Sequence, residues 1–98
     1  MILVRDVLQV KFGQMDNILA ALIASASSSQ TSTVSRILTD LSGQYFTLVV
    51  ETKAESMDAY WEALQASFTD PEQQEQMSPF GEFVESGHRE FFTIEFEA

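Results

Sequence analysis

Cysteine is absent from the chain, and histidine occurs only once, as His88. The first absence excludes disulfide bonds, thiol nucleophiles and thiolate metal sites together, and the second leaves few nitrogen ligands for zinc. Glycine-rich phosphate loops and the HExxH and GxSxG motifs are missing as well, which removes support for phosphoryl transfer, zinc proteolysis and serine hydrolysis. We therefore expect neither a metal site nor a bound cofactor.

Positive charge is scarce. The chain has 5 Lys and Arg residues against 15 Asp and Glu residues, for a formal net charge of -10. The basic residues are scattered along the chain as Arg5, Lys11, Arg36, Lys53 and Arg89. Because phosphate backbones and anionic membrane surfaces would repel such a chain, we expect no nucleic-acid partner and no membrane partner. The negative charge is consistent with a role in keeping the protein soluble and equally with an adaptation to high salt.

Long apolar runs are also missing, since none approaches the roughly 18 to 20 residues of a membrane-spanning helix. The N-terminal stretch MILVRDVLQVKFG lacks the basic start and the long apolar core of a signal peptide. The sequence therefore predicts a soluble, intracellular protein of the cytoplasm. A length of 98 residues favours a single domain over residues 1–98, because the chain is too short for two independent cores.

What the sequence does contain is a change of hydrophobic period near its start. Apolar residues alternate along residues 2–12, which predicts a strand. After Gly13 the apolar positions fall at the spacing of one helix face. They are Met15, Ile18, Leu19, Leu22 and Ile23. The low-complexity run SASSSQTST, Ser25 to Thr33, is expected to end this helix and form a loop, since small hydroxylated residues compete with backbone hydrogen bonds.

Two β-rich runs follow, Val34 to Leu41 and Tyr45 to Thr52. Their connection includes Gly43, which can take the positive φ that a tight turn requires, so we predict a hairpin. A second amphipathic helix is predicted after Ser56, with Asp58 in its first turn, where a carboxylate complements the helix dipole. Its apolar positions are Met57, Tyr60, Trp61, Leu64 and Phe68.

The last third of the chain predicts a short helix and a strand. Asp70 can cap a helix that Pro71 begins, and Pro79 and Gly81 close it. Glu85 to Glu97 supply the aromatic and β-branched bulk of a final strand. The resulting order, β-α-β-β-α-(α)-β, predicts an α+β, ferredoxin-like split βαβ fold, with helices on one face of a four-stranded antiparallel sheet.

The second face of this sheet also carries apolar bulk. It would show on the order of eight large apolar side chains, a patch beyond what monomers usually expose. A second copy of the chain, packed sheet against sheet about a two-fold axis, is the simplest cover, so we expect a homodimer. The residues assigned to this face by strand parity are Leu3, Arg5, Val7, Gln9, Val34, Arg36, Leu38, Asp40, Tyr45, Thr47, Val49, Glu51, Arg89, Phe91, Thr93 and Glu95.

Four stretches carry a resemblance to a known superfamily. They are VKFGQMD entering the first helix, LTDLSGQYFTLVVE around the hairpin, ESMDAYWEAL in the second helix and VESGHREFFTIE at the final strand. With them nearly the whole chain resembles the dimeric α/β-barrel superfamily, and within it the NIPSNAP-like and antibiotic-biosynthesis-monooxygenase-like members. The resemblance implies a dimeric α/β barrel. It also implies one of several roles, among them cofactor-free monooxygenase, haem-degrading enzyme, small-molecule isomerase and small protein with no assigned activity.

His88 is the candidate general base, because histidine is the residue type whose ordinary pKa lies near neutrality. Its parity joins it to Phe92 and Phe96, on the side expected to face the helices, while Arg89 would point to the second face. A bulge at Gly87 would reverse this assignment. A structural histidine at a strand end, a ligand-binding residue and a catalytic base remain alternatives.

Four residues are candidates for ligand binding. Arg5, Arg36 and Arg89 all fall on predicted strands and on the second face, where a buried arginine needs either a carboxylate such as Glu51 or a bound acidic molecule. Ion pairs within the chain and a cavity for a small carboxylate-bearing or polyketide-like molecule are the alternatives. Trp61 lies on the apolar stripe of the second helix, as a core-edge anchor or a ligand contact.

These observations leave the chemistry open. The haem-degrading branch of the superfamily combines a helical histidine with an asparagine and a tryptophan. Here no predicted helix holds a histidine, and Asn17 is the one asparagine, so that pattern is not met. Our first hypothesis is a small dimeric barrel that binds a small apolar or acidic molecule or serves as an accessory module. A cofactor-independent monooxygenase-like enzyme acting on an aromatic or apolar molecule is the second, and a purely structural role is the third.

Overall fold

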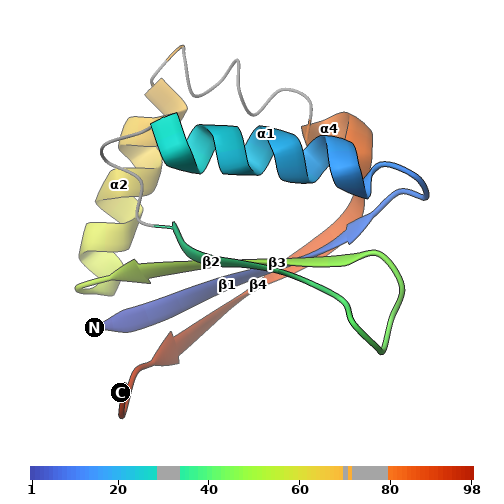
Figure 1. Ribbon diagram of the computed structural model, residues 1–98. Helices are drawn as coiled ribbons and strands as arrows, with labels where there is room; N and C mark the ends of the chain where they lie inside the picture. The colour runs from blue at the N-terminus through green and yellow to red at the C-terminus, as the bar shows by residue number, and fades with distance from the viewer. Residues whose placement is uncertain (29–33, 70, 72–79) are drawn as a thin grey trace.

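The polypeptide forms a layer of helices on one side of a single sheet. The computed structural model describes residues 1–28, 34–69, 71 and 80–98. Their elements are β1 (Ile2–Val10), α1 (Met15–Ser28), β2 (Val34–Thr39), β3 (Thr47–Ala54), α2 (Met57–Thr69), α4 (Phe80–Phe83) and β4 (Val84–Thr93). The strands pair antiparallel in the order β2-β3-β1-β4, and the helices lie above them (Figure 1). The predicted α+β, ferredoxin-like fold is confirmed.

The core lies between α1 and the helix-facing side of the sheet. Val10, Ile18, Leu48 and Val50 are buried there, because directly paired residues of antiparallel strands share a face and α1 covers that face. The apolar stripe predicted for α1 is confirmed except at Ile23, which is 54% exposed. Partly buried residues packed against this core are Leu8, Met15, Leu19, Leu22, Val34, Ile37, Phe46, Phe83 and Val84.

The start of α2 agrees with the sequence. Ser56 Oγ accepts a hydrogen bond from the backbone N–H of Ala59 at 3.1 Å, which makes Ser56 the N-cap of the helix. Asp58 lies in the first turn, where its charge complements the helix dipole. Tyr60, one turn further on, is 8% exposed, and its ring contacts Phe91 of β4, so this residue joins α2 to the sheet.

The end of α1 differs from the prediction. The helix continues to Ser28, so the expectation that the serine-rich run ends it at Ser25 is wrong. Alanines at 24 and 26 alternate with the serines, and alanine has the highest helix propensity of all residues. Residues 29–33 of the predicted loop lie outside the described residues, as does the short helix predicted from Asp70 to Pro79, apart from Pro71.

The connection between β2 and β3 is longer than the three residues predicted. Asp40 closes it, because its carboxylate accepts a hydrogen bond from the backbone N–H of Thr47 at 3.0 Å. Gly43 has the positive φ that the turn prediction required, 105°, and Phe46 also takes a positive φ of 58°. Tyr45, which parity assigned to the second face, lies in this turn instead and is 81% exposed.

β4 contains the irregularity with the largest consequence for the site. Gln9 of β1 pairs with Ser86, but the next residue, Val10, pairs with Val84. Glu85 is therefore an extra residue in β4, a β-bulge. An extra residue moves every later side chain of a strand to the other face.

This bulge reverses the predicted orientation of the β4 side chains. His88 pairs with Val7 and lies on the sheet face away from the helices, which we call the open face. Arg89 pairs with Asp6 and faces the helices, as do Phe91 and Thr93. The predicted faces of five residues are thus wrong: His88, Arg89, Phe91, Phe92 and Thr93. The residue responsible is Glu85 and not Gly87.

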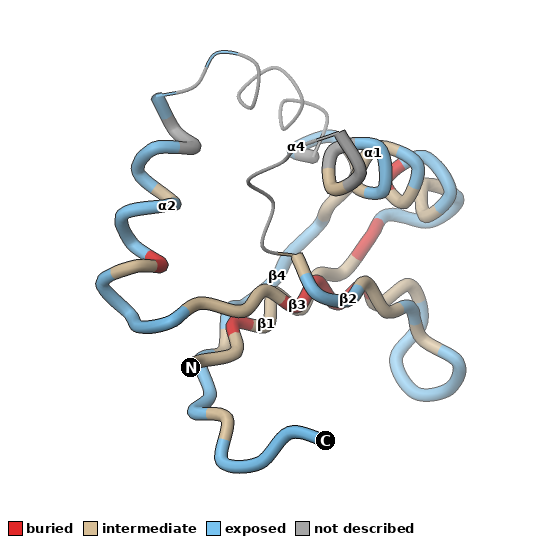
Figure 2. Tube along the Cα trace, turned by 60° about the vertical axis from the view of Figure 1, so that its left-hand side comes forward, coloured by how far each residue is buried: buried red, intermediate tan, exposed pale blue. Residues whose placement is uncertain are grey.

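Two further details of the sheet differ from the prediction. The pairing of β2 shifts between Val34 and Arg36, so Val34 lies opposite Thr52 and packs into the core and is not on the open face. β4 ends at Thr93 and not at Glu97. The remaining residues turn beneath the open face, and both chain ends lie at the same side of the molecule (Figures 1 and 2).

Candidate functional site

A row of four charged side chains crosses the open face, one from each strand. Arg36 of β2 pairs with Glu51 of β3, Glu51 with Arg5 of β1, and Arg5 with Glu90 of β4. Side chains at directly paired positions are neighbours on one face, so the sign of the charge alternates from one edge of the sheet to the other. We call these four residues the charged row.

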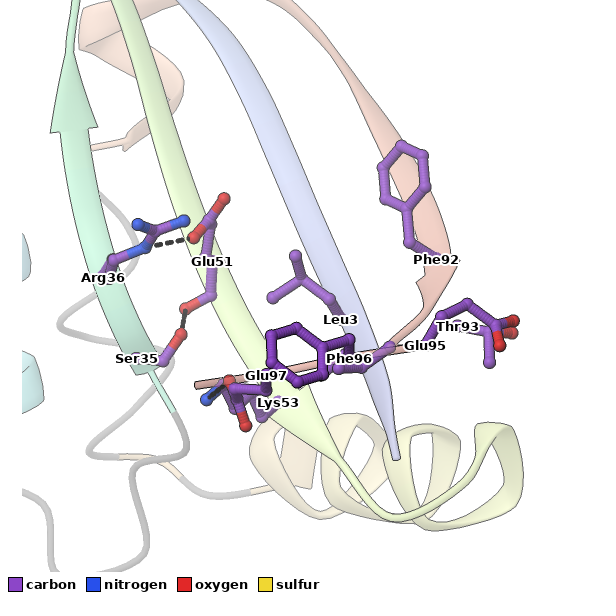
Figure 3. Close-up of a pocket in the computed structure, with 11 residues that line it drawn as sticks. Leu3, Ser35, Arg36, Glu51, Lys53, Phe92, Thr93, Glu95, Phe96 and Glu97 are labelled. Atoms are coloured by element: carbon purple, nitrogen blue, oxygen red, sulfur yellow. Dashed lines mark hydrogen bonds and ion pairs between the residues drawn. The ribbon is translucent and has the colours of Figure 1, made fainter.

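Direct ion pairs hold the charged row together. Arg36 Nε donates a hydrogen bond to Glu51 Oε1 at 2.6 Å (Figure 3), and Arg5 Nε lies 3.3 Å from Glu51 Oε2. Arg5 Nη1 lies 3.5 Å from Glu90 Oε1. The hydrogen bond and the charge of Glu51 raise the pKa of Arg36. The ion-pair alternative for Arg5 and Arg36 is therefore realised within the chain.

Glu51 is the most enclosed member of the charged row. It is only 3% exposed, because two guanidinium groups lie against its carboxylate from the strands on either side. Arg5 and Glu90 are about one-third exposed at their side chains, and Arg36 at the β2 edge is 65% exposed. The row is thus buried at its centre and accessible at both ends.

A hollow on one side of the charged row is walled by the segment after β4. Glu97 of this segment forms an ion pair with Lys53 of β3, which ties the tail across the open face (Figure 3). Ile94 N–H also donates a hydrogen bond to the carbonyl of Met1 at 3.2 Å. The residues lining this hollow are Leu3, Ser35, Arg36, Glu51, Lys53, Phe92, Thr93, Ile94, Glu95, Phe96 and Glu97.

A second hollow lies on the other side of the charged row. Leu38, Val49, Val7 and His88 form the next row across the sheet, one from each strand. His88 Nε2 lies 3.4 Å from Glu90 Oε2, and the side chain of His88 is 61% exposed. The imidazole therefore sits at the outer edge of the sheet, beside a carboxylate that Arg5 already holds.

On the helix-facing side, Arg89 occupies a different environment. Its Nε donates a hydrogen bond to Asp6 Oδ1 at 2.5 Å, and its guanidinium carbon lies 5.6 Å from the centre of the Tyr60 ring, within cation–π range. Burial opposes the charged form of Arg89, but the hydrogen bond and charge of Asp6 outweigh it and raise the pKa of Arg89. Burial likewise raises the pKa of Tyr60.

The Tyr60 ring that Arg89 contacts belongs to a cluster of three aromatic rings. Tyr60 and Trp61 have ring centres 5.6 Å apart, and Tyr60 and Phe91 are also 5.6 Å apart, both pairs edge to face. Trp61 and Phe91 are 6.4 Å apart. Tyr60 is buried, whereas Trp61 is 46% and Phe91 40% exposed. We call Tyr60, Trp61 and Phe91 the aromatic shelf.

The sequence-predicted site residues thus fall into two groups on opposite faces. Arg89 and Trp61 meet around Tyr60, while Arg5 and Arg36 share Glu51 on the open face. His88 belongs with the second group, so it does not reach the aromatic shelf.

Sequence reasoning missed four residues that complete these groups: Glu90, Phe91, Asp6 and Tyr60, the last of which was assigned only to the apolar stripe of the second helix. Glu90 and Phe91 were hidden by the bulge at Glu85, which no periodicity reveals. Asp6 carried a usable signal, since it is the one charged residue that interrupts the apolar parity of β1. A charge on a helix-facing position predicts a partner of opposite sign on a neighbouring strand.

Two classes of site find no support in the part of the chain that the structure describes. No cluster of three or more His, Asp or Glu side chains there could hold a metal ion. Among the same residues, no helix has both the length and the apolar character needed to cross a membrane.

Comparisons with known proteins give matches of structure alone. No protein-family model matches the chain, and no curated protein matches its sequence. A NIPSNAP domain protein from Burkholderia xenovorans superposes with a TM-score of 0.84 at 14% identity, covering 95% of this chain and 93% of its own. A NIPSNAP family protein from Agrobacterium tumefaciens gives 0.83 at 14% identity, with 94% and 90% covered.

Members of a second group match less closely. A candidate antibiotic biosynthesis monooxygenase from Deinococcus radiodurans gives a TM-score of 0.70 at 13% identity, covering 100% of this chain and 96% of its own. Sequence identities this low support a shared fold and no shared function. The chain therefore has the ferredoxin-like α+β fold of NIPSNAP domain proteins and of proteins like the antibiotic biosynthesis monooxygenases, as its sequence resemblance implied.

Proposed function

We propose that this chain is a homodimeric small-molecule-binding module that takes a flat apolar or aromatic molecule on the aromatic shelf. The observation that carries the proposal is the pair of half-exposed rings, Trp61 and Phe91, supported from below by the buried Tyr60. The three rings contact one another and form a contiguous apolar surface, and contiguous exposed apolar surfaces mark binding sites more often than single exposed side chains do.

The shelf favours ligands of one shape. A planar molecule can stack on or meet the edges of Trp61 and Phe91, and an aromatic pair contributes about 0.5 to 1.5 kcal/mol beyond the apolar area it buries. An acidic or phenolic group on such a ligand would point to Arg89, whose side chain is 39% exposed. Because Asp6 already offsets the charge of Arg89, we expect the acidic group to add selectivity more than affinity.

The homodimer is supported by the surface area of the chain. The chain exposes 6903 Å², whereas a folded monomer of its mass, 11.0 kDa, exposes about 5,600 Å². The excess of about 1,300 Å² exceeds the roughly 800 Å² that each partner buries in a standard interface. The radius of gyration of 13.7 Å is likewise above the about 12.6 Å of a compact chain of this length.

The open face provides the matching apolar surface. Leu3 and Phe92 lie on one side of the charged row, and Leu38, Val49 and Val7 on the other. In the part of the chain that the structure describes, only the tail after Thr93 passes over this face, and it does so at one end. A second copy would cover these side chains, and light scattering at micromolar concentration should give twice the mass of the chain.

Ligand binding is testable because Trp61 is the only tryptophan. Naphthoic acid and the uncharged naphthalenemethanol are suitable probes. We expect both to shift or quench the emission of Trp61, and naphthoic acid to bind more tightly. Calorimetric titration of the Phe91→Ala variant should show affinity reduced about three- to tenfold, the size of one aromatic contact.

Phe12→Ala is the matched control for this experiment. Phe12 is 84% exposed in the turn after β1, away from the shelf, so its removal should leave both titrations unchanged. Equal loss of affinity in the two variants, or binding heat without any change in Trp61 emission, would place the ligand elsewhere and contradict the proposal.

A cofactor-independent monooxygenase-like activity on an aromatic molecule is the alternative. Several proteins of the same fold are described as candidate antibiotic biosynthesis monooxygenases. It receives less support because His88, the candidate base, lies across the sheet from the aromatic shelf. Oxygen uptake measured with an aromatic polyketide phenol tests this activity, and uptake that is lost in Tyr60→Phe but kept in His88→Ala would favour it over simple binding.

A further inference from the structure

The charged row has a symmetry property that bears on how two copies can meet. Read across the strands in the order β2-β3-β1-β4, its charges are plus, minus, plus and minus, with each residue directly paired to the next. Reversing the order of the strands inverts the sign at every position. The row therefore meets opposite charges when it faces a copy with the strand order reversed. It meets like charges when it faces a copy with the same strand order.

Two orientations of a face-to-face dimer follow from this. A two-fold axis that runs along the strands, between β3 and β1, places β2 over β4 of the second copy and β3 over β1. Arg36 then faces Glu90 of the second copy, and Glu51 faces Arg5. An axis at right angles to the strands that runs along the charged row places each strand over its own copy, so that Arg36 faces Arg36 and Glu51 faces Glu51.

We propose that the open face pairs with a second copy of this chain about a two-fold axis along the strands, and that the charged row selects this orientation. The inference rests on the homodimer proposed above and adds its geometry. Opposite charges meet at all four positions of the row in this arrangement, whereas like charges meet at all four in the other.

The neighbouring apolar row fits the same arrangement. Val7 of β1 would face Val49 of β3 in the second copy, which places the two central valines in contact. Leu38 at the β2 edge would face His88 at the β4 edge. An axis across the strands that runs along the charged row would instead place Val49 over Lys53 of the second copy and Val7 over Leu3. The apolar row therefore favours the same axis as the charges, which commonly set specificity more than affinity.

The ends of the charged row retain the capacity to bond across an interface. Arg36 is 65% exposed at its side chain and uses Nε for Glu51, which leaves its terminal nitrogens free to donate to another carboxylate. Glu90 is 36% exposed and can accept from that arginine. Bidentate arginine–carboxylate pairs across the interface would use these groups.

Charge reversal at the two ends tests the orientation. Arg36→Glu alone sets two pairs of like charges against each other in its homodimer, and so does Glu90→Arg alone. We expect each variant to dimerise at least roughly tenfold more weakly than the wild type in sedimentation equilibrium. An equimolar mixture of the two variants should form the mixed dimer, because opposite charges then meet again at both ends.

Two controls separate this result from other causes. Lys11→Glu makes the same change of charge on an exposed turn and should leave dimerisation unchanged. Arg36→Glu mixed with wild type distinguishes the axes. For the proposed axis this mixed dimer is weaker than the wild-type dimer, whereas for an axis across the strands it is tighter than either homodimer.

Chemical cross-linking gives an independent measurement, since the chain has no cysteine and introduced thiols react alone. With a short bismaleimide, Arg36→Cys mixed with Glu90→Cys should cross-link, and Arg36→Cys by itself should not. A wild-type chain that sediments as a monomer would overturn the homodimer and this geometry together. A wild-type dimer whose variants fail to recover on mixing, or in which Arg36→Cys cross-links to itself, would overturn the geometry and leave the homodimer standing.

Discussion

Gly87 is the position at which one added methyl group tests the register of β4 most directly. A Cβ atom there would lie 2.6 Å from Leu8 Cδ2 and 3.0 Å from the carbonyl oxygen of Val7. Both distances are shorter than the about 3.5 to 4.0 Å of a favourable contact. Leu8 packs against the core beneath α1, so its side chain has little room to retreat. We expect Gly87→Ala to destabilise the fold.

The magnitude follows from opposing terms. Overpacking of this kind costs about 1 to 3 kcal/mol, and the buried methyl group contributes up to about 0.8 kcal/mol of stabilisation. The net loss in the free energy of unfolding should therefore be about 1 to 2 kcal/mol. For a chain of 98 residues, this lowers Tm by about 4 to 16 °C, at about 4 to 8 °C per kcal/mol.

Thermal and urea unfolding followed by circular dichroism measure this loss, at one protein concentration for all variants. Gly81→Ala is the matched control, because a Cβ atom at Gly81 meets nothing within 4 Å, and its Tm should not fall. Leu8→Val removes the atom that clashes, so the double variant with Gly87→Ala should lose less than the two single losses added. A Gly87→Ala protein with the wild-type Tm and no coupling to Leu8→Val would refute the register of β4, and with it the faces of His88 and Arg89.

Three other predictions concern the ionisable groups. Glu51→Gln removes the carboxylate shared by Arg5 and Arg36 and should lower the free energy of unfolding by about 1 to 3 kcal/mol in urea titrations; an unchanged midpoint would show that the charged row contributes no stability. Burial raises the pKa of Tyr60, so the stability that depends on its neutral phenol is complete below the ordinary value of about 10 and is lost as the pH rises through the higher folded value. As the pH rises above about 10, the wild type should therefore lose more stability than Tyr60→Phe, and parallel curves would contradict this. Asp6→Asn leaves the partly buried Arg89 without its carboxylate and should cost about 1 to 2 kcal/mol by the same measurement, whereas the wild-type midpoint in this variant would show that the pair is dispensable.

Much of the fold was predictable because its signals are local. The alternation of β1, the helical spacing after Gly13 and the capping serine at Ser56 each follow from a few adjacent residues, and each agrees with the structure. Boundaries were less accurate where two propensities compete. The run from Ser25 to Ser28 is helical, although serine favours turns, because alanines share it.

The candidate site was less predictable, since it depends on how distant strands align. Both faces of β4 are rich in apolar and charged residues, so parity alone could not choose between them, and the single extra residue Glu85 reversed the choice. The arginines were found from their type and strand position. Their partners Glu90 and Asp6 required the pairing of β1 with β4, which joins residues more than eighty positions apart.

The charged row also limits how this sequence can change over evolutionary time. A substitution that reverses the charge of Glu51 would oppose two arginines at once, so it is tolerable only if Arg5 and Arg36 change with it. Arg36, at the exposed edge with one partner, is the freest member of the row. In relatives of this chain, substitutions at these positions should therefore occur together and preserve the alternation of sign, even where the individual residues differ.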